Sequence, residues 1–229
     1  MSTLPIPSTI STPHLTLLRL TDTSPSPSNT HLQYFHENWT DPDATSWSLH
    51  GPCHSLEESQ TWMVECLVKR DNLFYSIFVK PDGSGEGVEN ELGTHVGSIG
   101  LRRQDTGPTL PAPPLVEEHG SASEAGAKEK EVDLRVIGYA LFKRAWGKGY
   151  ATEAAAALLK AYTASVAEEK AKGEKAFYVE AGVDEGNPAS DAVLRKVGFK
   201  KVGWKTETES VFLGGEWRSG GYWIYGQYV

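Results

Sequence analysis

The chain has 229 residues, of which 39% are hydrophobic and 23% are charged, and its formal net charge is -8. This length suits one large domain, and the composition is that of an ordinary globular protein. The acidic balance disfavours nucleic-acid binding, which needs a basic surface to displace counterions. Because no apolar run approaches the ~18 residues of a membrane-spanning helix, we expect neither a nucleic-acid nor a membrane partner.

The chain contains two cysteines, Cys53 and Cys66, and neither belongs to a CxxC motif or a Cys/His cluster in the sequence. This pattern disfavours a disulfide scaffold and a cysteine-based zinc site, and we expect no bound metal. The first residues also lack the basic and apolar regions of a secretory signal. A reducing compartment fits both observations, so the expected location is cytoplasmic.

Local patterns place the strands and helices of the first half of the chain. Ser55-Leu-Glu-Glu58 has the form of a capping box, which predicts a helix that continues to about Lys69. Residues 73–79 are rich in β-branched and aromatic side chains and indicate a strand. The other elements expected here are a strand at 14–20, a short helix around 32–39, a turn at 41–43, a loop at 81–93 and a strand at 94–101.

Residues 105–131 differ in composition from the rest of the chain. Several prolines precede a tract rich in Gly, Ala, Ser, Glu and Lys, without apolar periodicity. Such a segment cannot bury enough apolar surface to offset its ordering entropy. A strand precedes it and the expected partner strand follows directly. We therefore interpret it as a flexible insertion within a single domain that spans 13–229, after an N-terminal tail at 1–12.

After the insertion, the sequence predicts a strand at 133–142, a long helix at 149–170 and a strand at 176–183. This order favours a right-handed βαβ crossover with parallel neighbouring strands. The predicted fold class is therefore mixed α/β (α+β), with about seven strands and about four helices in one sheet. The remaining elements are a short helix at 188–197 and two closing strands at 199–212 and 221–229.

The segment Arg144-Ala-Trp-Gly-Lys-Gly149, between strand 133–142 and the long helix, carries the most informative chemistry. Two glycines spaced by one residue leave the backbone open, and the first helical turn presents N–H groups without intrahelical partners. With the helix dipole, these groups favour an anion such as a pyrophosphate. Arg144 and Lys148 add positive charge. A plain tight turn before a helix explains the same residues, so local evidence leaves both interpretations open.

Two other phosphate-binding motifs fit this segment less well. The P-loop pattern G-x-x-x-x-G-K-[ST] is absent. The dinucleotide pattern G-x-G-x-x-G/A fails because Thr152 holds its third position. This pattern also requires an acidic residue about 20 positions further on, at a strand end. Position 169 falls within the predicted helix instead, and Glu180 comes too late.

The pattern R-x-x-G-x-G at 144–149 resembles the [QR]-x-x-G-x-[GA] pyrophosphate loop of the GNAT superfamily of N-acetyltransferases. Further segments that resemble this family, in the expected order, lie at 95–102, 137–139 and 187–199. The last of these is similar to the N-x-x-S...G-F segment of the branch that includes the ribosomal-protein N-terminal acetyltransferases. The resemblance covers roughly residues 13–229, interrupted by the insertion.

The resemblance implies a mainly antiparallel sheet whose central parallel pair splays apart, with acetyl-CoA bound in the gap as a co-substrate. Backbone N–H groups of 144–149 would hold the pyrophosphate, and strand 139–142 would pair with the pantetheine and polarise the acetyl carbonyl. The implied reaction is direct attack of an amine on the thioester in a ternary complex, without a metal. The residues implied to contact the cofactor are Tyr139, Ala140, Leu141, Phe142, Arg144, Ala145, Trp146, Gly147, Lys148, Gly149, Tyr150, Ala151, Asn187 and Ser190.

The reaction also needs an acid that protonates the leaving thiolate. Many family members use a Tyr for this step, but Leu194 occupies that position here. In the branch with the N-x-x-S pattern, the resemblance implies Ser190 as the acid, with Asn187 orienting it or the cofactor. Asn187 followed by Pro188 is equally a standard helix start, so a structural explanation stands beside the functional one.

The general base is harder to identify, because Val136 occupies the position where relatives carry a Glu. Glu180 on the next strand is the candidate named here, and Asp184 and His95 are alternatives. Each of the three is also explained as a structural or solvated residue. An amine of low pKa, or a chain of water molecules, needs no dedicated base.

Aromatic residues crowd the C-terminal strands, where they either pack the sheet or form a wall that selects the acceptor. The expected acceptor is an amine, either a small molecule or a protein N-terminus, and the acidic charge mildly favours a cationic one. We expect a monomer or a homodimer. Because the usual Tyr and Glu are missing, a non-catalytic acyl-CoA-binding module is the alternative function.

Overall fold

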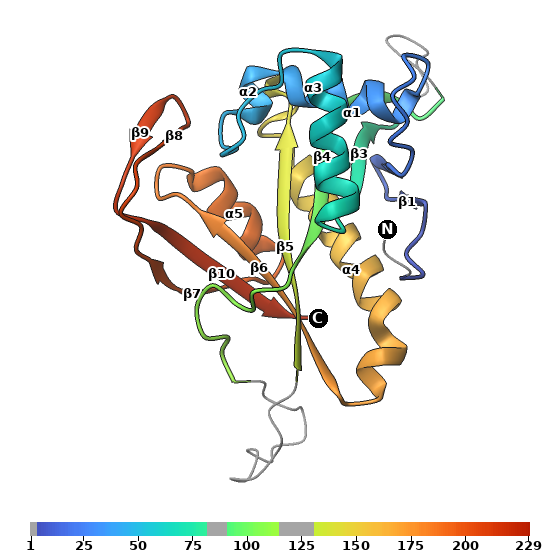
Figure 1. Cartoon of the computed structure of the whole chain (residues 1–229). Helices are drawn as coiled ribbons and strands as arrows, with labels where there is room; N and C mark the ends of the chain where they lie inside the picture. Colours follow the sequence, from blue (N-terminus) through green and yellow to red (C-terminus); the bar gives the residue numbers. More distant parts are fainter. Residues whose placement is uncertain (1–3, 82–90, 115–130) are drawn as a thin grey trace.

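A computed structural model of the chain describes residues 4–81, 91–114 and 131–229. Its centre is an eight-stranded sheet, drawn as arrows in Figure 1. The strands in chain order are β1 (Thr9–Ser11), β2 (Leu15–Arg19), β3 (Leu73–Val79), β4 (Thr94–Gln104), β5 (Glu131–Leu141), β6 (Lys175–Val183), β7 (Lys200–Lys205) and β10 (Tyr222–Tyr228). A separate two-stranded hairpin consists of β8 (Val211–Leu213) and β9 (Glu216–Arg218).

The order of strands across the sheet is β1-β2-β3-β4-β5-β6-β10-β7. The neighbours are antiparallel except for the central pair β5 and β6, which is parallel. This arrangement confirms the predicted mixed sheet with a parallel central pair. The described chain has ten strands rather than about seven, and β1 lies within the expected N-terminal tail.

The predicted closing strand at 199–212 is wrong beyond Lys205. Residues 206–210 leave the sheet, and the chain then forms the β8–β9 hairpin. Gly214 and Gly215 connect the two hairpin strands with φ values of +61° and +84°. Positive φ at both turn residues is the requirement of a type I′ turn, which glycine meets without strain.

The helices confirm the predicted ones with small shifts at their ends. Residues 41–43, expected as a turn, start the short helix α2, because the Asp41 carboxylate accepts the Ala44 N–H at 2.7 Å. Within the described residues, no helix has the length and apolar character needed to cross a membrane. The helices are α1 (Thr30–Thr40), α2 (Pro42–Thr45), α3 (Leu56–Val64) with a π-helical turn at Glu65–Lys69, a 3₁₀ turn at Lys143–Ala145, α4 (Tyr150–Ala171) and α5 (Pro188–Lys196).

The two faces of the sheet are covered by different helices (Figure 1). Long helix α4 packs its residues Leu158 and Tyr162 on one face, in a core that includes Leu73 of β3. Helices α1 and α3 cover the other face, in a second core that includes Phe74. Adjacent residues of β3 thus enter opposite cores, because successive side chains of a strand point to opposite faces.

The central parallel pair opens into a V. Pairing between β5 and β6 runs from Glu131 opposite Lys175 to Val136 opposite Glu180. Beyond that point β5 continues beside β4 and β6 continues beside β10, without pairing to each other. In Figure 1 the two strands diverge toward the end of the molecule where α5 and the β8–β9 hairpin lie. This splay exposes one backbone edge of each strand.

The first part of the expected insertion packs on the sheet. The Thr109 N–H donates to Glu180 on β6, a methyl group of Leu110 lies against Gly203 on β7, and the Pro113 carbonyl accepts the Tyr228 hydroxyl. Residues 115–130 of the insertion lie outside the described residues, as do 82–90 of the loop expected at 81–93.

Candidate functional site

The loop between β5 and α4 has the open backbone that its two glycines predicted. Gly147 and Gly149 have φ values of +72° and +85°, in the left-handed region that glycine adopts without strain. A Cβ atom added at either position would meet no other atom within 4 Å. Both glycines therefore border open space, and a side chain there would enter it.

Helix α4 begins directly after Gly149 and has no side-chain N-cap. Among the described residues, none accepts a hydrogen bond from the N–H groups of residues 147–152. These groups lie at the positive end of the dipole of a 22-residue helix. Unpaired N–H groups at such a helix start form an anion-binding site. The geometry thus favours the phosphate interpretation over the plain turn.

Arg144 turns away from these N–H groups. Its guanidinium donates to the His95 carbonyl at 2.7 Å and lies 4.2 Å from the centroid of the Phe142 ring. It also lies 3.7 Å from a carboxylate oxygen of Glu37. The side chain therefore ties the loop to β4 and α1, and the predicted contact of residue 144 with an anion rests on its backbone.

Glu153, in the first turn of α4, holds the N-terminal segment. Its carboxylate accepts the Thr12 hydroxyl at 2.6 Å and the His14 N–H at 3.0 Å, and it lies 3.0 Å from His14 Nδ1. Partial burial raises the pKa of Glu153, but these hydrogen bonds outweigh it and lower the pKa below its usual value. Glu153 thus has a structural role beyond its favourable position in the helix dipole.

A cavity of ≈ 350 Å³, the loop cavity, lies between this loop, β5 and α5. Phe142, Arg144 and Lys148 were also predicted to contact the cofactor but do not line it, and Phe142 is buried in the core. The structure thus brings together most of the residues implied to contact the cofactor. Those that line the loop cavity are Tyr139, Ala140, Leu141, Ala145, Trp146, Gly147, Gly149, Tyr150, Ala151, Asn187 and Ser190.

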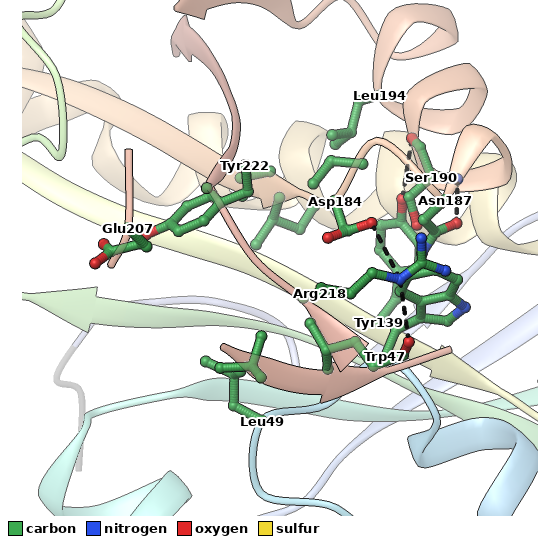
Figure 2. A pocket seen from close by; sticks show the side chains of 18 of the residues that line it. Trp47, Leu49, Tyr139, Asp184, Asn187, Ser190, Leu194, Glu207, Arg218 and Tyr222 are labelled. Carbon is green, nitrogen blue, oxygen red and sulfur yellow. Dashed lines mark hydrogen bonds and ion pairs between the residues drawn. The ribbon is translucent and has the colours of Figure 1, made fainter. Parts of the chain in front are cut away.

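A second cavity of ≈ 490 Å³, the splay cavity, lies where β5 and β6 diverge. Gly138 on β5 and Gly182 on β6 both line it, and a Cβ atom at Gly138 would meet nothing within 4 Å. Figure 2 shows Asp184, Arg218, Asn187 and Ser190 close together in this cavity, with Tyr222 and Glu207 on its other side. Four residues line both cavities, so the two meet there: Trp47, Tyr139, Asn187 and Ser190.

The junction of the cavities contains the predicted acid. Asn187 Oδ1 accepts the Ser190 N–H at 3.1 Å and caps α5, as the structural explanation expected. The Tyr139 hydroxyl donates to the Ser190 carbonyl at 3.4 Å. The Ser190 hydroxyl also interacts with the Tyr139 hydroxyl, which partly opposes the burial that raises the pKa of Tyr139. Leu194, at the position of the usual Tyr, is buried and lines the splay cavity.

The three candidate bases occupy different surroundings. Asp184 lines the splay cavity, accepts the Gly186 N–H at 2.8 Å and lies 3.7 Å from Arg218 Nε. Glu180 is 2% exposed and lines neither cavity. His95 is buried in the sheet with Nδ1 2.7 Å from Glu37 and also lines neither cavity. Among the three, Asp184 is placed to contact a ligand directly.

The surroundings of Glu180 change its acidity. Burial raises the pKa of this carboxyl, and the opposing hydrogen bonds from Thr109 and the charge of Arg102 do not fully offset it. Both carboxylate oxygens accept the Thr109 N–H, at 3.0 and 3.1 Å. Glu180 therefore ionises less readily than an exposed glutamate.

Sequence reasoning missed Trp47, Arg102 and Arg218, which line the splay cavity. Arg218 comes from β9, and its guanidinium carbon lies 5.4 Å from the centroid of the Trp47 ring. The Gly214 N–H also donates to the Ser46 carbonyl at 2.8 Å. The hairpin thus closes one side of the cavity against the segment after α2. Of the aromatic residues predicted in the C-terminal strands, Tyr222 lines the cavity, whereas Trp217 is 73% exposed on the hairpin.

One group of potential metal ligands occurs among the described residues. Ligand atoms of His50, Cys53 and Glu58 lie within 4.8 Å of one another, although the sequence pattern did not indicate a Cys/His cluster. Burial raises the pKa of the Cys53 thiol, and the Glu58 carboxylate accepts the N–H of His54, the residue before the N-cap of α3, at 2.7 Å. The group lines neither cavity.

Known proteins share this architecture. The family model for the acetyltransferase (GNAT) domain matches residues 25–200. No curated protein sequence matches the chain.

Solved structures that are similar to the chain include three enzymes. The ribosomal L7/L12 alpha-N-protein acetyltransferase RimL, in complex with coenzyme A, has a TM-score of 0.57 and 18% identity, over 96% of this chain and 98% of that chain. The Salmonella typhimurium acetyltransferase that modifies the N-terminal serine of ribosomal protein L7/L12 has a TM-score of 0.53 and 18% identity, over 96% of this chain and 99% of that chain. Spermidine N-acetyltransferase from Vibrio cholerae, in complex with CoA and spermine, has a TM-score of 0.58 and 13% identity, over 95% of this chain and 96% of that chain. At these identities the likeness shows a shared fold.

Proposed function

Because the chain belongs to the GNAT acetyltransferase family, we propose that it transfers the acetyl group of acetyl-CoA directly to an acceptor amine in a ternary complex. The observation that carries this proposal is the meeting of two cavities at Ser190, with the unpaired N–H groups of 147–152 at the loop cavity. One cavity suits a long anionic cofactor, and the other suits the acceptor.

Acetyl-CoA would bind along the loop cavity. Its pyrophosphate would accept hydrogen bonds from the N–H groups of 147–152, and its pantetheine would pair with the free edge of β5 near Tyr139–Leu141. β6 does not pair with this stretch of β5, because it diverges after Glu180. The thioester would then lie at the junction beside Ser190. A backbone N–H of the same edge would stabilise the oxyanion that forms from the acetyl carbonyl.

The acceptor amine would enter the splay cavity as a neutral nucleophile. Its nitrogen lone pair attacks the carbonyl carbon, the tetrahedral intermediate collapses, and the carbon–sulfur bond breaks. We assign protonation of the departing thiolate to Ser190 Oγ, which lines both cavities. The amine loses its proton to a base, and exchange with solvent returns a proton to Ser190.

Two carboxylates compete for the role of base. Glu180 lines neither cavity, so it would accept the proton through water. Asp184 lines the splay cavity, 3.7 Å from Arg218 Nε, and would accept the proton from the amine directly. Burial raises the pKa of Glu180, which makes this carboxylate a better proton acceptor than an exposed one. The pH dependence of kcat in variants of the two carboxylates separates these roles.

The acceptor belongs to the same proposal. Among the similar structures, one enzyme modifies the N-terminal serine of a ribosomal protein and another is bound to spermine, so both protein N-termini and polyamines suit the fold. A cytoplasmic location agrees with the free thiols of Cys53 and Cys66.

A thiol-release assay tests the proposed activity against the alternative, a non-catalytic acyl-CoA-binding module. The protein is incubated with acetyl-CoA and a panel of amines that contains spermidine, short peptides with N-terminal Ser, and amino acids. Amine-dependent release of CoA thiol, with an acetylated product in mass spectra, is the expected result. Thermal protection by acetyl-CoA without thiol release from any amine would instead favour the binding module.

A further inference from the structure

Arg102 lines the splay cavity from β4, on the sheet face opposite α4. Its neighbour Leu101 packs in the α4 core, and successive side chains of a strand point to opposite faces. Arg102 pairs in register with Val136, and Val136 pairs with Glu180, so the three residues form one row across β4, β5 and β6. This row is the last that pairs β5 with β6. Arg102 therefore lies at the vertex of the splay.

Arg102 forms no ion pair with any of the described residues. Within the described residues, no carboxylate lies within 4.0 Å of its guanidinium, although the side chain is half-buried. Glu180, in the same row, directs both oxygens to the Thr109 N–H. Arg218, the other cation in the cavity, is by contrast 3.7 Å from Asp184 and 3.4 Å from Glu216. An anionic ligand would stabilise a half-buried cation that has no carboxylate within ion-pair distance.

The electrostatic surroundings of Arg102 agree with this argument. Burial lowers its pKa, and the positive charge of Arg70 adds to the effect. Glu180 and Tyr222 act in the opposite direction without offsetting the burial. The positive charge is thus poorly compensated in the absence of a ligand.

The reacting nitrogen must lie at the other end of the cavity, at the junction with Tyr139 and Ser190. On β5, Tyr139 lies three positions after Val136, which is in the row of Arg102. At ~3.3 Å per residue this is a span of about 10 Å. Ile137, Gly138 and Gly182 of β5 and β6 line the cavity between the two ends and offer no charge, whereas Asp184, Glu207, Glu209 and Arg218 line other parts of it. The two strands therefore present an uncharged surface between the junction and Arg102.

We propose that the splay cavity takes a small amine whose far end carries a carboxylate, with Arg102 binding that carboxylate and a spacer of up to about 10 Å between the two groups. The inference rests on the proposed function, because it requires the amine to meet a thioester at the junction. An arginine fork matches a carboxylate with two parallel hydrogen bonds, which gives directional selectivity. Long-chain amino acids and dipeptides share this chemistry.

Matched acceptors test the anion site. Aminohexanoate, aminohexanamide and diaminohexane have similar length and differ at the far end in charge, and a dipeptide with its amide provides a second pair. We expect kcat/KM for aminohexanoate to exceed the other two by roughly 10- to 100-fold, the value of a hydrogen-bonded charge. Arg102→Met should reduce this ratio to about one, and Arg102→Lys should restore part of it. Each acid is compared with its own amide, and the acid whose preference depends more on Arg102 shows whether the natural acceptor is a long-chain amino acid or a dipeptide.

Arg103→Met is the matched control, because Arg103 is exposed and pairs with Asp105 at 2.9 Å. It should leave the ratio unchanged. Equal or better use of the amide or the diamine by the unmodified protein would overturn the anion site, as would a preference that survives Arg102→Met. Thermal shifts of the protein–CoA complex with each of the three compounds measure their binding without turnover, and aminohexanoate should give the largest shift. Absence of thiol release with every amine would contradict the proposed function, and the binding order would still decide the role of Arg102.

Discussion

Glu180 on β6 directs both of its carboxylate oxygens to the backbone N–H of Thr109, at 3.0 and 3.1 Å. The contact joins the centre of the sheet to the start of a segment whose composition predicts no packed structure. It leaves the carboxyl 2% exposed, and burial is the main reason why its pKa is raised. A buried glutamate with a raised pKa affects both stability and the proposed chemistry, and each effect can be measured.

Replacement of Glu180 by Gln should stabilise the protein at neutral pH. A carboxyl whose pKa is raised in the folded state favours folding below its unfolded pKa of about 4.3, and this contribution is lost as the pH rises through the folded pKa. Gln is uncharged and keeps an oxygen that accepts the Thr109 N–H. At pH 7 we expect the melting temperature to rise by roughly 2–4 °C, which corresponds to on the order of 1 kcal/mol in a chain of this size.

The same comparison near pH ~3, well below the unfolded pKa, is the control for Glu180→Gln. Wild-type Glu180 is then almost fully protonated in both states, so the two melting temperatures should converge. A lower melting temperature for the variant at pH 7 would show that the ionised carboxylate stabilises the fold, against the direction of its pKa shift.

The pH dependence of kcat identifies the base. Glu180→Gln and Asp184→Asn each remove one candidate base. The variant that lacks the true base should lose about 10²–10⁴-fold in kcat, together with the fall of kcat at acidic pH, and the other variant should keep this fall. If Glu180 is the base, this fall lies above pH 4.5, because the pKa of Glu180 is raised from that value. Exposed Glu185→Gln serves as the control. Normal profiles for both variants would show that neither residue is the base.

Gly149→Asp tests the proposed pyrophosphate site. The new carboxylate would project into the open space beside the N–H groups of 147–152 and would repel a phosphate. Acetyl-CoA at 100 times its Kd should raise the unfolding free energy of the unmodified protein by about 2.7 kcal/mol, and this protection should vanish in the variant. Thermal unfolding with and without acetyl-CoA measures the effect.

Gly173→Asp is a matched control for backbone strain. Gly173 follows the other end of α4, has a φ of +74° and has open space around its Cβ position. Both substitutions force a side chain into the left-handed region and should cost about 1–2 kcal/mol in stability. Protection by acetyl-CoA should persist in the control. Equal protection of both variants would place the anion site elsewhere.

The predictable parts of the fold and site share one property, which is that their signals are local. The βαβ unit of β5, α4 and β6 follows from apolar runs and turn residues, and the loop cavity follows from glycines whose positive φ the helix start requires. The β8–β9 hairpin also had a local signal, since Gly214 and Gly215 between two short runs predict a two-residue turn. The aromatic residues of 199–212 obscured it by suggesting a continuous strand.

The splay cavity could not be predicted in the same way, because its lining depends on contacts between distant segments. Trp47 and Arg218 meet only when the hairpin crosses to the segment after α2. Arg102 and Glu180 face the same side only through the register of three strands. Alternation along β6 does place Glu180 opposite the α4 core, but its cover by Thr109 comes from a segment without any periodic pattern.

Ser190→Ala tests the proposed acid. Ser190 lines both cavities, and its hydroxyl interacts with the Tyr139 hydroxyl, so the substitution removes this one contact of the folded protein. The cap of α5 survives, because it uses the Ser190 N–H and Asn187 Oδ1. Loss of an interaction made in the transition state lowers kcat, here by about 10²–10⁴-fold, with little change in acetyl-CoA affinity. Melting curves and acetyl-CoA titrations accompany the kinetics. A folded variant with near-normal kcat would leave solvent as the acid, and weaker cofactor binding at unchanged kcat would make Ser190 a binding residue.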